Sequence, residues 1–265
     1  MTAPRPRVEV RRVRGGLELR IDGTQASVHR SGRALTGAVW WALASPILLL
    51  PRTRSRRVLL LGLAAGSVGR AVRALDPDAA IVGVERDREV LRLARRHFAL
   101  DRLGVELVVG DALEYLRRER RLFDLIVEDL FVGPSRSVRK PDWLLGEGYR
   151  LIRERLRPAG FVVSNTIHET RDVVRAMRPI GGRIVSLDVR GHWNRVTVCG
   201  RDLPPPAGLR RVLKARDETS RILGRLALRT RGAASLSHGG GVEHERRGSR
   251  PATATRGSCA GQPRS

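Results

Sequence analysis

The chain has 265 residues, 41% of them hydrophobic, which is enough for one sizeable domain with a buried core and some additional segments. Its formal net charge of +24 suggests a polyanion as partner, yet Lys140 and Lys214 are the only lysines among 51 basic residues and 4% of the residues are aromatic. Codon composition explains such an arginine bias better than phosphate binding does. We therefore expect no nucleic-acid partner.

The apolar segments and the cysteines exclude two further classes of protein. The longest apolar run, residues 38–50, is interrupted by Ser45 and Pro46 and is too short to cross a bilayer. Cys199 and Cys259 have neither the spacing of metal ligands nor that of a disulfide framework. We expect a soluble, cytoplasmic protein without a membrane partner and without a metal site.

The first predicted unit covers residues 1–51. Alternating apolar and polar residues between positions 8 and 29, with glycines at the turns, predict a small antiparallel β unit. Residues 35–50 predict a buried helix in which Trp40 and Trp41 pack in the core and Pro46 ends or kinks the helix.

Strands and helices alternate in the second predicted unit, residues 52–200, which predicts an α/β fold with a mostly parallel, doubly wound sheet. Residues 184–199 predict a terminal antiparallel hairpin, as in the Rossmann-like fold of class I methyltransferases. The predicted strands are 58–61, 81–84, 105–109, 125–128 and 161–165, and the predicted helices are 68–75, 87–98, 112–118, 143–155 and 169–177.

The remaining residues predict two shorter units. Apolar residues at partial helical spacing in 201–231 predict one amphipathic C-terminal helix. Residues 232–265 are rich in Gly, Ser, Thr and Arg and predict a disordered tail.

A glycine turn marks the first candidate site. In VLLLGLAAGSVG, residues 58–69, a buried strand runs into Gly62 and Gly66 and then into a helix. This arrangement is typical of nucleotide-binding domains, where bare backbone approaches the ligand. The alternative is a plain tight turn.

Three acidic residues follow the next three predicted strands, at the edge where ligands bind in open α/β sheets. Glu85 is placed to accept the hydroxyl hydrogens of a ribose, and Asp111 to accept an adenine amino group or to cap a helix. Asp129 is a candidate base or, alternatively, a solvated loop acid. Glu128 is another candidate acid, although strand alternation points its side chain away from Asp129.

The segments VLLLG, GVERD, VVGDA, FDLIVED and LRPAGFVV, in this order, resemble the spermidine synthase family of class I S-adenosylmethionine-dependent transferases over residues 17–199. LRIDGTQ resembles the part of that family that leads into a β cap, where a glutamine lies near the sulfonium ligand. The resemblance implies S-adenosylmethionine or decarboxylated S-adenosylmethionine as the donor. It also implies ligand or catalytic positions at Gln25, Gly62, Glu85, Asp111 and Asp129, of which Asp129 matches the family's base. For Gln25 the alternative is a β-turn side chain.

The chain also departs from this family. Ala65 stands where the family has an acid that meets the aminopropyl amine, and Val132 stands where it has a second acid. Residues 36–37 replace a Tyr-Gln or Tyr-His pair of a gate segment. Burying an amine without a carboxylate partner is costly, so the departures leave methyl transfer and aminopropyl transfer both open.

We therefore predict a spermidine synthase-like transferase that moves a methyl or aminopropyl group to a small-molecule nucleophile, with Asp129 as the base. The alternative is a non-catalytic nucleoside- or nucleic-acid-binding module. Asn165 and His168 are further candidates on the substrate side, whereas residues 192–194 are interpreted as a hairpin turn. The resemblance also implies a homodimer.

Overall fold

The structure, a computed structural model, describes residues 6–36, 38–52, 55–134 and 137–231. The predicted disordered tail, residues 232–265, lies outside the described residues. In the part that is described, no helix is both long and apolar enough to cross a membrane.

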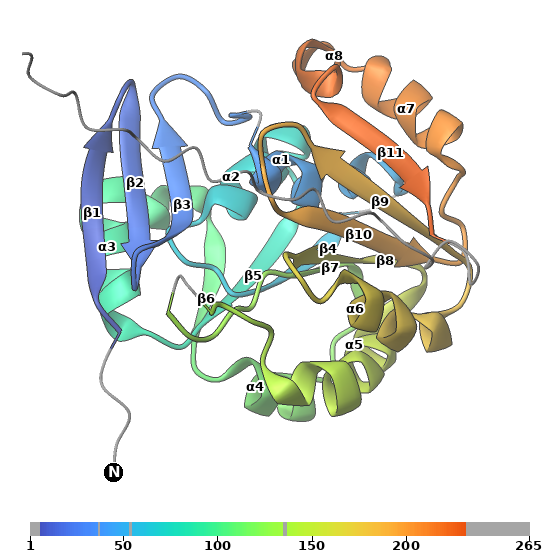
Figure 1. Ribbon diagram of the computed structural model, residues 1–265, viewed down its shortest axis with the longest axis horizontal. Coiled ribbons are helices and arrows are strands. Elements are labelled where there is room, and N and C mark those ends of the chain that lie inside the picture. Colours follow the sequence, from blue (N-terminus) through green and yellow to red (C-terminus); the bar gives the residue numbers. More distant parts are fainter. Residues whose placement is uncertain (1–5, 37, 53–54, 135–136, 232–265) are drawn as a thin grey trace, which may run out of the picture.

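The first three strands form a small antiparallel sheet in the order β1-β2-β3, as the alternating sequence predicts (Figure 1). The strands are β1 (Val8–Val13), β2 (Gly16–Ile21) and β3 (Thr24–Arg30). Ser67, at the start of α2 (Ser67–Leu75), attaches this sheet to the rest of the chain, because its Oγ accepts from the Val28 amide and donates to the Val28 carbonyl, each over 2.9 Å. The small sheet is thereby held beside the glycine turn that precedes α2.

The strands described in the rest of the chain form one eight-stranded sheet in the order β11-β9-β10-β8-β7-β4-β5-β6 (Figure 1). Strands β4 to β8 pair in parallel, whereas β9, β10 and β11 add an antiparallel end. The predicted mostly parallel sheet with an antiparallel terminus is confirmed. The strands are β4 (Arg57–Leu61), β5 (Ala80–Glu85), β6 (Val105–Val109), β7 (Phe123–Glu128), β8 (Leu156–Thr166), β9 (Arg183–Val189), β10 (Arg195–Gly200) and β11 (Leu226–Thr230).

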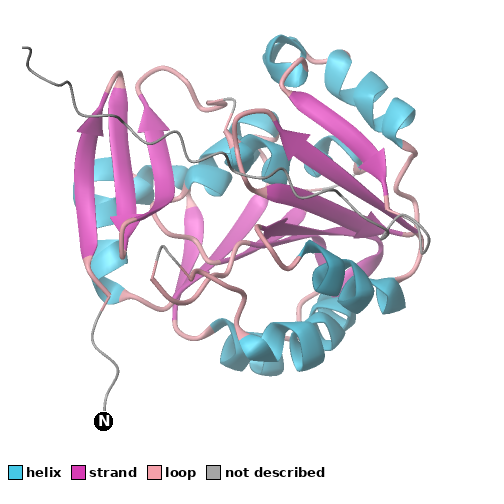
Figure 2. Cartoon of the chain, in the orientation of Figure 1, coloured by secondary structure: helices cyan, strands magenta, loops and turns pink. Residues whose placement is uncertain are grey.

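Helices cover both faces of the large sheet (Figure 2). One face packs on α1 (Val39–Ala44), α2 and α3 (Arg88–Phe98), and the other on α4 (Ala112–Arg118), α5 (Tyr149–Arg155) and α6 (Thr170–Met177). Strand alternation divides β4 between the two cores, because Leu60 packs in the first and Leu59 and Leu61 in the second. Short helical turns lie between these elements: η1 (Ser45–Leu49), η2 (Leu100–Leu103), η3 (Leu144–Gly148) and η4 (Arg178–Ile180).

Two predicted helices differ from the observed elements. The buried helix expected at residues 35–50 is shorter, because α1 changes into the 3₁₀ turn η1 at Ser45–Pro46, where the proline removes a backbone donor. The single C-terminal helix expected at residues 201–231 is wrong. That region contains α7 (Pro206–Lys214), α8 (Asp217–Leu223) and the strand β11. β11 forms because β9 offers an unpaired sheet edge, with which residues 226–230 pair antiparallel.

Candidate active site

A cavity of about 400 Å³ lies at the carboxyl ends of the parallel strands. Along the sheet from β6 to β8, its wall includes Asp111, Glu85, Gly62, Asp129 and Asn165, each at or just beyond the end of a different strand. The turn between β2 and β3 and the helix α1 supply further lining residues. The topology therefore brings together side chains that are far apart in the sequence, at the edge where open α/β sheets bind ligands.

The glycine turn after β4 forms part of the floor of this cavity. Gly62 has φ +85°, and a Cβ at this position would lie 2.7 Å from the Asp129 carbonyl oxygen, so both the backbone conformation and the space require glycine. Gly66, with φ +81°, precedes α2 and packs against Leu100 and Leu103, and it is not among the described residues that line the cavity. Of the two predicted glycines, Gly62 lines the cavity and Gly66 shapes the turn behind it.

Glu85 ends β5 and joins the glycine turn to the cavity wall. Its Oε2 accepts a hydrogen bond from the Ala64 amide over 2.9 Å, and its Oε1 accepts one from the Asp87 amide over 3.1 Å. Burial raises the pKa of Glu85, and these amide donors oppose the shift. Each carboxylate oxygen can accept more than one hydrogen bond, so Glu85 retains the capacity to accept hydroxyl donors from a ligand.

Asp111 lines the cavity from the loop after β6, and Gln25 lines it from the small sheet. Asp111 caps α4, with Oδ1 accepting from the amides of Leu113 and Glu114 over 2.8 and 3.3 Å. It also lines the cavity, so the helix-cap interpretation and a ligand role are compatible. Gln25 lines the cavity from β3, where its Nε2 donates to Glu18 Oε1 over 2.5 Å.

Asp129 follows β7, and its amide donates to the Leu61 carbonyl over 2.9 Å. Asn165 Nδ2 donates to Asp129 Oδ1 over 2.7 Å, and Asn194 Nδ2 donates to Asn165 Oδ1 over 3.0 Å. Burial raises the pKa of Asp129 to about 7, while the hydrogen bonds from Asn165 and Trp40 act in the opposite direction. A carboxyl with this pKa takes up or releases a proton near neutral pH, which suits a general base.

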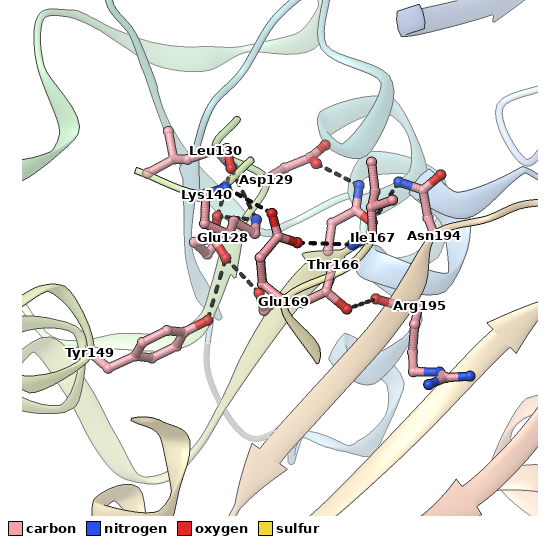
Figure 3. A network of polar contacts seen from close by, with 12 residues as sticks. Glu128, Asp129, Leu130, Lys140, Tyr149, Thr166, Ile167, Glu169, Asn194 and Arg195 are labelled. Atoms are coloured by element: carbon pink, nitrogen blue, oxygen red, sulfur yellow. Dashed lines mark hydrogen bonds and ion pairs between the residues drawn. The ribbon is translucent and has the colours of Figure 1, made fainter. Parts of the chain in front are cut away.

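Glu128 points to the other side of β7, as strand alternation predicts, and is fully buried (Figure 3). Its carboxylate accepts from Lys140 Nζ over 2.6 Å, from Ser164 Oγ over 2.5 Å and from the Leu130 amide over 2.8 Å. Lys140 Nζ also donates to the Leu130 carbonyl over 3.0 Å. Glu128 and Lys140 therefore anchor the loop after Asp129, and Glu128 is not available as an alternative acid in the cavity.

The sequence pattern does not identify Trp40 or Asn194 as lining residues, and two other positions considered from it lie outside the described lining. Trp40 is buried, as a core residue should be, yet it also lines the cavity, and its side chain helps to lower the pKa of Asp129. Asn194, interpreted as a turn residue, lines the cavity, whereas His168 is exposed and lies outside the described lining. Ala65 is buried behind the wall, where its amide donates to Ser27 Oγ over 3.0 Å.

No protein-family model matches the chain. The chain is 33% identical to Polyamine aminopropyltransferase 2 of Hyperthermus butylicus over 135 residues, which cover 49% of this chain and 44% of that protein. It is 31% identical to Polyamine aminopropyltransferase 2 of Pseudomonas aeruginosa over 160 residues, which cover 57% of this chain and 44% of that protein. The chain therefore matches less than half the length of these relatives.

Solved structures are similar over a larger share of the chain. A probable spermidine synthase from Corynebacterium glutamicum superposes with a TM-score of 0.65 at 17% identity, covering 88% of this chain and 96% of the other. Human Methyltransferase-like protein 13 in complex with SAH superposes with a TM-score of 0.58 at 20% identity, covering 75% and 96%. The resemblance inferred from the sequence segments is thus confirmed: the chain is similar in sequence and in fold to the spermidine synthase-like family of class I S-adenosylmethionine-dependent transferases.

Proposed function

We propose that the chain is an alkyltransferase that uses an S-adenosyl sulfonium donor and an amine acceptor, with Asp129 as the base. The observation that carries the proposal is the acidic lining of the cavity in a chain of net charge +24. A cationic sulfonium and a protonated amine are both attracted to such a lining. The carboxylates in the described lining are Asp22, Glu85, Asp87, Asp111 and Asp129.

The half of the cavity at β4, β5 and β6 has the groups needed to hold the nucleoside of the donor. In this proposal Glu85 accepts from the ribose hydroxyls, Asp111 lies at the adenine, and Gly62 lets the backbone approach the ligand. Gln25 covers the sulfonium end from the small sheet. Gly66 supports this arrangement indirectly, through the conformation of the turn. The donor supplies a carbon atom bonded to a positively charged sulfur.

Asp129 is placed to act on the nucleophile. When an amine nitrogen forms a bond to the carbon next to sulfur, the carbon–sulfur bond breaks and its electron pair stays on sulfur, which becomes a neutral thioether. The acceptor enters as an ammonium, so Asp129 as a carboxylate first accepts one of its protons and frees the nitrogen lone pair for this attack. The pKa of about 7 favours this transfer near neutral pH, and Asn165 holds the carboxylate in place.

Aminopropyl transfer is the preferred reaction, because the sequence relatives are named polyamine aminopropyltransferases.

Carboxylates in the cavity support aminopropyl transfer as well. An aminopropyl donor carries a positive amine that needs an acidic partner, and Asp22 and Asp87 line the cavity although position 65 has no acid. The non-catalytic binding module is not favoured by these relatives.

We propose further that the protein is cytoplasmic, that it forms a homodimer and that its acceptor is a small molecule. We also propose that the chain divides into residues 1–51, 52–200, 201–231 and 232–265.

Calorimetric titration with decarboxylated S-adenosylmethionine and with S-adenosylmethionine tests the donor. We expect tighter binding of the decarboxylated donor, and a clear preference for S-adenosylmethionine would favour methyl transfer instead. Asp129→Asn is expected to bind the donor with nearly unchanged affinity and to lose at least about 100-fold in turnover, as general base catalysis predicts. Absence of binding for both donors would contradict the proposed function.

A further inference from the structure

The half of the cavity at β7, β8 and β10 has mainly apolar walls. Five apolar residues form these walls. Phe131, Val132 and Val138 come from the loop after β7, Trp143 comes from just before η3, and Ile167 comes from just after β8. All five residues are partly exposed and line the concave surface. Apolar side chains exposed in a concave wall favour an apolar ligand surface.

The carboxylates of the cavity are divided unevenly between its two halves. Glu85, Asp87 and Asp111 follow β5 and β6, and Asp22 lies in the turn between β2 and β3. The described lining of the half at β7, β8 and β10 contains one carboxylate, Asp129. That half can therefore pair with one cationic or proton-releasing group.

Glu128, the other carboxylate near this wall, is not free to pair with a second positive charge on the acceptor. Lys140 Nζ lies 4.0 Å from the centre of the Phe131 ring, and its ion pair with Glu128 is formed inside the protein, with the two side chains 1% and 0% exposed. Glu128 is fully buried and outside the described lining, so it offers no partner to a ligand. An ammonium group against Phe131 would lose its hydration without gaining a carboxylate, because Glu128 is already paired with Lys140.

We propose that the acceptor is a primary monoamine with an apolar body, and not a diamine. Its nitrogen lies at Asp129 and its apolar body lies against Phe131, Val132 and Ile167. This inference rests on the proposed function, because the donor must occupy the other half of the cavity. The amine nitrogen forms a bond to the alkyl carbon next to sulfur, the carbon–sulfur bond breaks, its electron pair stays on sulfur in the neutral thioether, and Asp129 takes the proton from nitrogen.

Two amines of equal length test this inference with the full chain and decarboxylated S-adenosylmethionine. Pentylamine and 1,4-diaminobutane differ only in whether the far end is a methyl or an ammonium group. Release of the nucleoside thioether, measured by chromatography, gives kcat/KM for each amine. We expect pentylamine to exceed the diamine by at least about tenfold, and each added methylene from propylamine to pentylamine to raise kcat/KM by about fourfold.

Val132→Asp and Val132→Asn form a matched pair of variants that separates charge from size. Position 132 tolerates a polar side chain, because Val132 is partly exposed and its amide and carbonyl pair with the backbone of Arg139 at 2.8 and 2.9 Å. Val132→Asp is expected to raise kcat/KM for 1,4-diaminobutane relative to pentylamine by at least about tenfold. Val132→Asn is expected to lower the rate with pentylamine without favouring the diamine.

The outcomes separate this inference from the proposed function. A wild-type preference for the diamine, or equal rates with both amines, would overturn the monoamine proposal and leave the transferase intact. If the donor binds but neither amine reacts, calorimetric binding of the same two amines to the protein saturated with methylthioadenosine decides: tighter binding of pentylamine supports the inference, and equal or weaker binding overturns it. Failure of donor binding contradicts the proposed function, and the monoamine proposal falls with it.

Discussion

Asn165 Nδ2 donates to Asp129 Oδ1 over 2.7 Å, and this bond joins the ends of the neighbouring strands β7 and β8. Asn194, which precedes β10, orients the amide by donating to Asn165 Oδ1 over 3.0 Å. The amides of Asn165 and Asn194 thus hold the Asp129 carboxylate in place. Burial raises the pKa of this carboxylate to about 7. The same hydrogen bond limits that rise, because it favours the charged form of Asp129.

Replacement of Asn165 by Leu is expected to raise the pKa of Asp129 further. A hydrogen bond to a charged group contributes about 1.5–3 kcal/mol, which corresponds to about one to two pH units. The ascending limb of the profile of kcat/KM against pH should therefore move to higher pH by this amount, because Asp129 acts as a carboxylate. Carbon-13 NMR titration of the Asp129 carboxyl gives the same shift without requiring turnover.

Asn194→Ala is the matched control for this change. It removes the group that orients Asn165 but keeps the direct donor, so the pKa of Asp129 should rise by less than in Asn165→Leu. An unchanged titration of Asp129 in Asn165→Leu would show that the hydrogen bond does not stabilise the carboxylate.

The raised pKa of Asp129 also predicts how stability depends on pH. The folded protein binds the proton more tightly than the unfolded chain does, with a pKa of about 7 against the model value of 3.8. Protonation of Asp129 therefore stabilises the folded protein. This contribution is fully present below pH 3.8 and is lost as the pH rises through 7. Asp129→Asn should match the wild type near pH 4 and exceed it by up to about 4 kcal/mol at pH 8.

Urea denaturation of both proteins at intervals from about pH 4 to 8 checks this prediction. Other titrating groups are common to both proteins and cancel in the difference. A difference in the free energy of unfolding that stays constant with pH would contradict the raised pKa.

The sequence predicts the positions at which strands end, and therefore most of the cavity wall. Glu85, Asp111 and Asp129 each follow a strand of a parallel sheet, and parallel strands place their carboxyl ends at one edge. Strand alternation also places Glu128 correctly on the opposite side of β7. These features depend only on local patterns that recur along the chain.

Contacts between distant elements could not be predicted in this way. An apolar helix predicts that Trp40 is buried, but periodicity does not show that its side chain lines the same cavity as Asp129. Asn194 enters the cavity wall only because β10 pairs antiparallel with β8. The strand β11 depends on the free edge of β9, which local propensity does not reveal.

Gly62→Ala is expected to destabilise the protein through two separate effects. The left-handed φ of +85° costs an alanine about 1–2 kcal/mol, and its Cβ would also collide with the Asp129 carbonyl oxygen at 2.7 Å. Because this contact displaces Asp129, donor binding and turnover should decrease as well.

Gly32→Ala is the control for the first effect alone. Gly32 also has a left-handed φ, +69°, but a Cβ there would meet no atom within 4 Å. We expect Gly62→Ala to lower the free energy of unfolding by at least about 1 kcal/mol more than Gly32→Ala does, as measured by urea denaturation. Equal losses in the two variants would show that the contact with Asp129 relaxes at no cost.

The buried ion pair of Lys140 and Glu128 gives the last prediction. Lys140→Met leaves a buried carboxylate without its cation, so we expect a loss of about 3–5 kcal/mol in the free energy of unfolding. The double variant Lys140→Met with Glu128→Gln should recover much of this loss, because it removes the unpaired charge. Arg92→Met is the exposed control: Arg92 and Glu89 lie 2.7 Å apart with side chains 55% and 48% exposed, and the expected loss is much smaller, because solvent screens this pair. Urea denaturation of the four proteins of the Lys140–Glu128 double-mutant cycle, with Arg92→Met alongside, measures the coupling. If Lys140→Met cost no more than Arg92→Met, the loop after Asp129 would not depend on this ion pair for its anchorage.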